Sequence, residues 1–273
     1  MPALILDCDG VLAETERHLH LPSFNRAFAE FGIPVHWSED EYADKLLVNG
    51  GKERMATSIT PELVAAHGLS GGSGDLSGLL ERLHARKRQI FAELLEARAL
   101  PARPGVARII GAASAAGWRV AVASTSAEPT VRAVLRQVVG HEQANGIAVF
   151  AGDIAHRKKP APEIYELALE GLGTTASEAI AIEDSRNGLL AAHAAGLPCV
   201  VTISDYSAGE AFDEAALVLS SLGDPGEPMT VVANRTAARP DEYVRLSDLE
   251  AILRHHQDQQ HGRPRSHGGT RMG

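Results

Sequence analysis

Between residues 12 and 100, apolar residues recur at the spacings of an α-helix. The first run covers residues 20–32 and carries its apolar side chains at intervals of three and four, at Leu21, Phe24, Phe28 and Phe31. Further helical patterns cover residues 39–47, 60–68 and 79–100. No short apolar run typical of a strand interrupts this part of the sequence, so we expect it to be entirely helical.

The rest of the chain alternates short apolar runs with helical patterns. The predicted strands cover residues 4–6, 118–123, 147–150, 179–182, 199–203 and 216–219. The predicted helices among and after them cover residues 104–116, 129–139, 162–171, 186–195 and 244–254. Strands that alternate with helices predict a parallel sheet covered by helices, so the fold class is α/β with a helical insertion.

These patterns predict two domains and a tail. Residues 1–15 and 99–254 form the α/β core, and residues 16–98 form the helical domain inserted into it. Residues 255–273 are rich in Gln, His, Gly and Arg and contain one large apolar residue, Met272. Such a segment cannot bury enough apolar surface to fold, so we expect it to be disordered.

Composition and charge exclude several classes of function. The 273 residues carry 26 Lys and Arg against 35 Asp and Glu, a net charge of −9, so nucleic acid is not an expected partner. The two cysteines, Cys8 and Cys199, lie in or beside apolar runs and lack the spacing of a zinc site or a disulfide framework. No stretch is long and apolar enough to span a membrane, and Asp7 and Asp9 interrupt the first apolar run. We expect a cytoplasmic protein and, without an apolar seam, a monomer.

Two aspartates stand at the end of the first predicted strand. Side chains alternate along a strand, so Asp7 and Asp9 point the same way and Cys8 points the other way. Adjacent carboxylates repel each other unless a cation neutralises them or one carries a proton. The pair therefore suits a nucleophile beside a general acid/base, with a hard metal ion close by. A simple strand end followed by a turn is the structural alternative.

Polar residues follow three further predicted strands. Ser124 ends the second, Lys159 lies after the third, and Glu183 and Asp184 end the fourth. Each has a structural explanation by itself, such as a helix cap or a surface charge. Together they meet at the carboxyl edge of one sheet, where open α/β folds bind ligands. The set fits phosphoryl transfer. The Mg²⁺ ligands would come from Asp7, Asp9 through its main-chain carbonyl, and Asp184, with Glu183 as a further ligand or as a partner of the ligands.

Basic residues of the helical domain are candidates for binding an anion. Lys52 and Arg54 follow two glycines at the start of a helix, where the backbone can approach a ligand closely. Lys87 belongs to a basic run on the long helix of residues 79–100. Solvated surface charges are the alternative for all three residues.

The motif set resembles the haloacid dehalogenase (HAD) superfamily. It consists, in order, of Asp7-x-Asp9-Gly10-Val11, Ser124, Lys159-Pro160 and Glu183-Asp184. The resemblance implies a Rossmann-like core, a C1-type helical cap, and an aspartyl-phosphate on Asp7. It also implies that Asp9 protonates the leaving oxygen and then activates water. The second aspartate is similar to the phosphatase and phosphomutase branches rather than to the dehalogenases.

Several stretches are similar to the CbbY-type subgroup, which is related to β-phosphoglucomutase and includes xylulose-1,5-bisphosphate phosphatases. These are residues 13–16, 24–30, 50–54 and 222–225. This resemblance places His20, Lys52 and Lys87 around the substrate. An extra residue between Thr15 and His20 leaves His18 and His20 both open, and the alignment of Lys52 against Arg54 is open too. The candidate substrate-binding residues are Glu16, His20, Lys52, Arg54, Lys87, Thr125 and Ser126.

The function predicted from the sequence is a Mg²⁺-dependent phosphatase that acts on a small sugar phosphate. A ketopentose bisphosphate such as xylulose 1,5-bisphosphate is the substrate that the subgroup suggests. Two alternatives remain: a sugar phosphomutase with the same residues, and a catalytically silent sugar-phosphate-binding protein.

Overall fold

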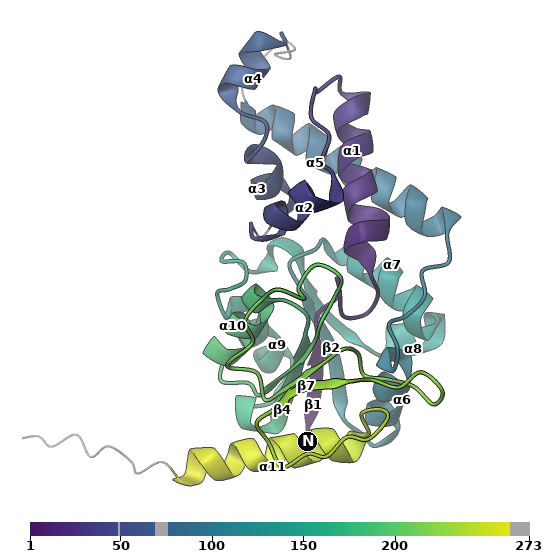
Figure 1. Ribbon diagram of the computed structural model, residues 1–273, viewed down its shortest axis with the longest axis vertical. Coiled ribbons are helices and arrows are strands. Elements are labelled where there is room, and N and C mark those ends of the chain that lie inside the picture. Colours follow the sequence, from purple (N-terminus) through teal and green to yellow (C-terminus); the bar gives the residue numbers. More distant parts are fainter. Residues whose placement is uncertain (49, 69–75, 263–273) are drawn as a thin grey trace, which may run out of the picture.

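The computed structural model describes residues 1–48, 50–68 and 76–262. A sheet with helices on both faces forms the lower part of the molecule, and a separate group of helices stands above it (Figure 1). The sheet has seven strands in the order β3-β2-β1-β4-β5-β6-β7. Their bounds are β1 (Ala3–Leu6), β2 (Arg119–Ser124), β3 (Ala148–Ala151), β4 (Ala179–Glu183), β5 (Cys199–Thr202), β6 (Leu217–Leu219) and β7 (Val231–Asn234). All neighbours are parallel except β6 and β7.

Alternate residues of β1 enter two different apolar cores. Leu4 and Leu6 pack with helices on one face, whereas Ala3 and Ile5 pack with helices on the other. The first face is covered by α6 (Val106–Ala115), α7 (Glu128–Val139) and α11 (Leu246–Gly262). The second face is covered by α9 (Glu163–Leu172) and α10 (Arg186–Ala194). Burial on both faces is the reason that the parallel strands are apolar throughout.

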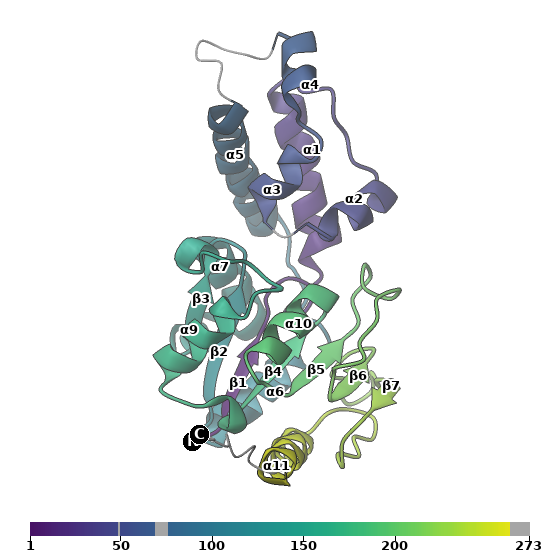
Figure 2. The same ribbon diagram turned by 90° about the vertical axis from the view of Figure 1, so that its left-hand side faces the viewer.

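The helical group, called the cap below, is inserted between β1 and α6. It contains η1 (Glu16–His20), α1 (Leu21–Glu30), α2 (Glu39–Leu46), α3 (Gly51–Ala56), α4 (Pro61–Ala66) and α5 (Leu76–Ala97). Its own apolar core is aromatic, with rings from Phe24, Phe28, Trp37 and Tyr42 in mutual contact. Figure 2 shows the cap above the edge to which the strands of the sheet point, with α11 at the opposite end of the core. The predicted α/β fold with a helical insertion is confirmed.

Several local predictions are wrong. Strand β7 and the short helix α8 (His141–Asn145) were not predicted, because their apolar signals are short. The helix predicted over residues 20–32 is confirmed as α1, but the π-helical turn η1 that precedes it, Glu16–His20, was not predicted. The expected disorder of residues 255–273 is wrong for residues 255–262, which continue α11. That helix is anchored by buried Ile252 and Leu253, and the Gln257 side chain donates to the main-chain oxygen of Ser177.

The remainder of the predicted tail, residues 263–273, lies outside the described residues. Within the part of the chain that the structure describes, no helix is long and apolar enough to cross a membrane.

Candidate active site

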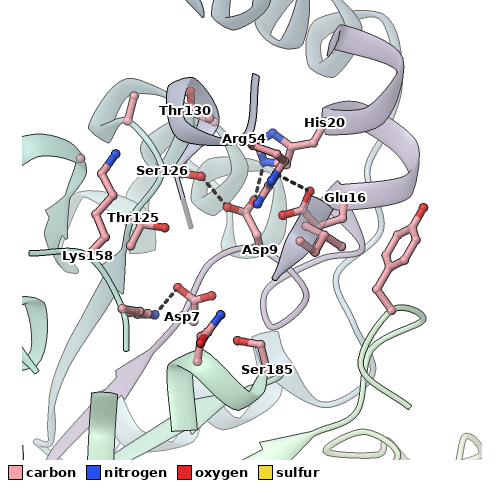
Figure 3. Close-up of a pocket in the computed structure, with 18 of the residues that line it drawn as sticks. Asp7, Asp9, Glu16, His20, Arg54, Thr125, Ser126, Thr130, Lys158 and Ser185 are labelled. Atoms are coloured by element: carbon pink, nitrogen blue, oxygen red, sulfur yellow. Dashed lines mark hydrogen bonds and ion pairs between the residues drawn. The ribbon is translucent and has the colours of Figure 1, made fainter. Parts of the chain in front are cut away.

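A pocket opens where the carboxyl ends of the parallel strands meet the cap. Its core wall includes Asp7, Asp9, Ser126, Lys159 and Asp184. Its cap wall includes Glu16, His20, Lys52, Arg54 and Lys87. Figure 3 shows that Asp7 and Asp9 both reach the pocket from the end of β1, with Glu16, His20 and Arg54 on the cap side. The structure therefore brings residues far apart in the sequence to one place.

Asp7 is buried and paired with a lysine. Its Oδ1 atom lies 2.8 Å from Nζ of Lys159, and its main-chain N–H donates to Ile182. Burial raises the pKa of Asp7 to about 7; Lys159 opposes this effect, and the nearby carboxylates Glu183 and Asp9 add to it. A further cation beside Asp7 would favour the ionised carboxylate, which is the nucleophilic form.

Lys159 joins three groups at the base of the pocket. Its Nζ atom lies 2.8 Å from Asp7 Oδ1, 2.6 Å from Glu183 Oε1 and 3.0 Å from the main-chain oxygen of Ala123. Burial lowers the pKa of Lys159, but Asp7 and Glu183 raise it more, so the pKa is above its ordinary value. The lysine is therefore a cation at neutral pH, and its hydrogen bond fixes the orientation of Asp7.

Three buried carboxylates form a cluster that suits a metal ion. Ligand oxygens of Asp7, Glu183 and Asp184 all lie within 4.8 Å of one another. Burial raises the pKa of Asp184, and Asp7 raises it further. Glu183 Oε1 accepts from Lys159 and Tyr165, while Glu183 Oε2 has no hydrogen-bond partner among the described residues. One lysine against three carboxylates leaves an excess of negative charge, and an all-oxygen donor set fits a hard cation such as Mg²⁺.

Asp9 has partners different from those of Asp7. Its carboxylate accepts from Thr15 and Ser126, both at 2.5 Å, and lies 2.9 Å from Nε2 of His20. Burial raises the pKa of Asp9, but His20 and the hydrogen bonds from Ser126 and Thr15 lower it more strongly. The net shift is downward, so Asp9 is ionised and able to accept a proton. The Asp9 carboxylate also belongs to a second cluster of possible metal-ligand side chains, together with Glu16 and His20.

His20 connects Asp9 to a lysine of the cap. The second ring nitrogen of His20, Nδ1, contacts Nζ of Lys87, which is buried on α5. Burial lowers the pKa of Lys87 to about 7, with a further lowering from Arg54 and an opposing effect of Glu16. His18 is exposed and is not among the described residues that line the pocket, so His20 is the histidine of the two that the structure brings to the site.

Glu16 and Arg54 belong to a second polar network in the cap. The Tyr42 hydroxyl donates to Glu16 Oε2, and Arg54 Nη1 donates to the same hydroxyl at 2.8 Å. Arg54 is also 3.8 Å from Glu16, and it is buried. Lys52 lines the pocket without being fully buried. Both cations of the glycine-rich turn therefore reach the pocket.

The serine and threonine residues at the end of β2 and directly after it occupy different positions. Thr125 and Ser126 line the pocket. Ser124 is buried at the end of β2, its Oγ accepts from the main-chain N–H of Ser126, and the described lining residues do not include it. Glu183 is likewise buried and outside the described lining.

Among the residues that shape this site and were not predicted from the sequence are two tyrosines and a lysine. Tyr42 organises the Glu16 and Arg54 network, and Tyr165 contacts Glu183 below the pocket. Lys158 lines the pocket and forms an ion pair of 3.1 Å with Glu53 of the cap. In the sequence the two tyrosines cannot be distinguished from ordinary core aromatic residues. Lys158 cannot be distinguished from its basic neighbours in residues 157–159.

Comparisons with known proteins agree with this geometry. A model of the haloacid dehalogenase-like hydrolase family matches residues 1–196, which include the ends of β1, β2 and β4. The chain is 44% identical over 234 residues to the plasmid-borne protein CbbY of Cupriavidus necator, covering 84% of this chain and 89% of that protein. A CbbY-like protein of Arabidopsis thaliana is 43% identical over 225 residues, 82% of this chain and 70% of the relative.

Comparison with solved structures also finds CbbY and a related protein. A CbbY mutant from Rhodobacter sphaeroides, crystallised with xylulose-(1,5)bisphosphate, matches with a TM-score of 0.72 and 38% identity over 81% of this chain and 95% of that one. A putative beta-phosphoglucomutase from Thermotoga maritima matches with a TM-score of 0.57 and 27% identity over 80% of this chain and 93% of that one.

Proposed function

This chain belongs to the haloacid dehalogenase-like hydrolase family and is a phosphatase of that family, and we propose that it hydrolyses a small sugar phosphate with Mg²⁺. The observation that carries the proposal is the pairing of Asp7 with Lys159 at 2.8 Å, next to an Asp9 carboxylate held by Thr15, His20 and Ser126. One carboxylate is thereby oriented as a nucleophile, and the other is positioned to move a proton.

In the first step, a carboxylate oxygen of Asp7 attacks the phosphorus atom. A bond forms between Asp7 and phosphorus, the bond between phosphorus and the sugar oxygen breaks, and Asp9 gives its proton to that oxygen. Asp9 is ionised in the free site, so it takes up this proton when the anionic phosphate raises its pKa.

In the second step, Asp9 takes a proton from water. The resulting nucleophile attacks phosphorus, which releases inorganic phosphate and restores the Asp7 carboxylate. The main-chain N–H of Thr125, which lines the pocket, and the hydroxyl of Ser124, which is buried at the end of β2 outside the described lining, are our proposed donors to the phosphoryl oxygens. Lys159 holds Asp7 in line.

Mg²⁺ would be held by Asp7 and Asp184 of the acidic cluster, with Glu183 as a further candidate. The main-chain oxygen of Asp9 is our proposal for another ligand. When bound, the ion neutralises phosphoryl oxygens and the excess of carboxylate charge. Two observations support this assignment. Among the described residues, Glu183 Oε2 has no hydrogen-bond partner, and Lys159 is the lysine that pairs with the carboxylates of the cluster.

We propose a sugar carrying a second phosphate, such as a ketopentose bisphosphate. Lys52, Arg54 and Lys87 line the cap wall, opposite Asp7, and supply positive charge away from the reacting phosphoryl group. The relative from Rhodobacter sphaeroides that was crystallised with xylulose-(1,5)bisphosphate supports the same class.

The test is phosphate release from pentose and hexose mono- and bisphosphates, with and without Mg²⁺. We expect Mg²⁺-dependent release that is fastest for a ketopentose bisphosphate, and almost none from folded Asp7→Asn. Release that persists in Asp7→Asn would contradict the proposal. No release from any ester by the folded wild-type chain would favour the catalytically silent binding protein.

A sugar phosphomutase is the second candidate, because the cap residue His20 contacts Asp9 and a putative beta-phosphoglucomutase matches the fold. Product analysis with glucose 1-phosphate separates the two activities. Glucose 6-phosphate would indicate a mutase, and free phosphate would indicate a phosphatase. A monomer remains our prediction for the assembly, and sedimentation analysis would test it.

A further inference from the structure

Arg103 is a buried cation between the cap and the core. It follows α5 in the second of the two segments that join the cap to the core, and its side chain is 8% exposed. We propose that Arg103 is a positioning residue that fixes the turn carrying Asp9 and ties together the two linkers of the cap. The proposal rests on the phosphatase function proposed above.

The guanidinium group of Arg103 bonds to three separate segments. Nη1 donates to the main-chain oxygen of Gly10 and, at 3.0 Å, to that of Thr202 at the end of β5. Nη2 donates to the main-chain oxygen of Ser220, just after β6, at 3.1 Å. The planar fork of an arginine can hold several carbonyls in a fixed arrangement, which a lysine cannot do.

Arg103 also connects the two linkers directly. Its Nε atom lies 2.9 Å from Oε1 of Glu14, which belongs to the first linker. The main-chain N–H of Arg103 donates to Leu12 at 3.0 Å. Arg103 of the second linker therefore holds residues 10–14 of the first linker through both its side chain and its backbone.

The turn that Arg103 holds has little room to move. Gly10 has a φ of +74°, and a Cβ atom built on it would lie 2.0 Å from Oδ2 of Asp184. Asp9 precedes this glycine, so a shift of the Gly10 carbonyl also shifts Asp9 relative to Asp7 and Asp184. A misplacement of about 1 Å in a reacting group can cost roughly 100-fold in rate.

Arg108 offers a matched control. It lies on α6, and it also uses its guanidinium to hold several groups: Asp224 at 2.9 Å, the main-chain oxygen of Val244 at 2.7 Å and that of Leu222 at 3.3 Å. None of these partners lines the pocket as described. Its removal therefore costs stability in a similar way without touching the turn at Gly10.

The experiment compares Arg103→Met, Arg103→Lys and Arg108→Met in the full chain. Phosphate release is measured with the best wild-type sugar phosphate, at a temperature where circular dichroism shows each variant folded. We expect both methionine variants to lower Tm. Of these two, Arg103→Met should lower kcat at least about tenfold, with KM changed less than about threefold, and Arg108→Met should leave kcat near the wild-type value. The kcat of Arg103→Lys should lie between those of wild type and Arg103→Met. If Arg103→Met does not fold, Arg103→Lys takes its place in the comparison.

Hydrogen exchange gives a readout that does not depend on turnover. Amides of residues 9–14 should exchange faster in Arg103→Met or Arg103→Lys, and at the wild-type rate in Arg108→Met. Equal kcat losses in the Arg103 and Arg108 variants, or unchanged kcat and exchange in the Arg103 variants, would overturn the inference. If the wild-type chain releases no phosphate, the proposed function fails, and exchange in residues 9–14 still decides the role of Arg103.

Discussion

The Nε2 atom of His20, in the cap, lies 2.9 Å from Oδ1 of Asp9, in the core. The two residues come from opposite walls of the pocket, as Figure 3 shows. This contact makes the placement of the proposed acid/base depend on the position of the cap. Cap closure can thereby be coupled to proton transfer, because Asp9 is fully organised only when His20 is in place.

Replacing His20 tests this coupling. We expect His20→Ala to lower kcat roughly 10- to 100-fold, because Asp9 loses one of its three side-chain partners. His18→Ala is the control, since His18 is exposed in the same helical turn. Steady-state phosphate release measures both variants. Equal losses in the two variants, or wild-type kcat in His20→Ala, would contradict a specific role for His20.

Lys87 should give the protein a distinctive dependence of stability on pH. Burial lowers its pKa in the folded state to about 7, against 10.5 as the ordinary value. Between these two values Lys87 binds more protons in the unfolded chain than in the folded one, so its contribution to the free energy of unfolding rises as pH increases from about 7 to about 10. Below pH 7 both states are charged, and the folded protein bears the full cost of burying the ammonium group.

Lys87→Met should remove that slope. We expect the variant to be more stable than wild type at pH 6.5 by roughly 1–4 kcal/mol and to differ less at pH 9.5. Arg82→Met, at an exposed position of the same helix, is the control and should leave the slope unchanged. Urea unfolding at a series of pH values provides the measurement. A wild-type slope that persists in Lys87→Met would show that another group titrates.

Tyr42→Phe tests the polar network of the cap. The variant removes the hydroxyl that joins Glu16 to Arg54 but keeps the ring that packs against Phe24. We expect KM for the sugar phosphate to rise about tenfold, the effect of losing one hydrogen bond to a charged group, with a smaller change in kcat. Tyr243→Phe, outside the described pocket lining, should leave KM unchanged. An unchanged KM in Tyr42→Phe would exclude the network from substrate binding.

The sequence predicts the chemistry at the strand ends better than the cap contacts. The proximity of Asp7, Lys159 and Asp184 could be predicted from the sequence, because each residue follows a predicted parallel strand. The carboxyl ends of parallel strands meet at one edge of the sheet.

Other features depend on packing that no local pattern contains. The contact between Tyr42 and Glu16 joins residues 26 positions apart, and Arg103 meets Ser220 across 117 positions. The extension of α11 to residue 262 depends on contacts such as that of Gln257 with Ser177, which outweigh a polar composition. Contacts of this kind can be identified only from the tertiary structure, because the chemistry of a side chain does not specify which distant residue it will contact.

The most direct test of the account is to trap the phosphoryl group on Asp7. Asp9→Asn cannot activate water, and p-nitrophenyl phosphate has a leaving oxygen that needs little protonation, so the covalent form should accumulate. After rapid acid quench, mass spectrometry should find one phosphoryl group on the peptide containing Asp7, and none in Asp7→Asn. A phosphoryl group on another residue, or equal p-nitrophenol release by Asp7→Asn and wild type, would contradict the central claim.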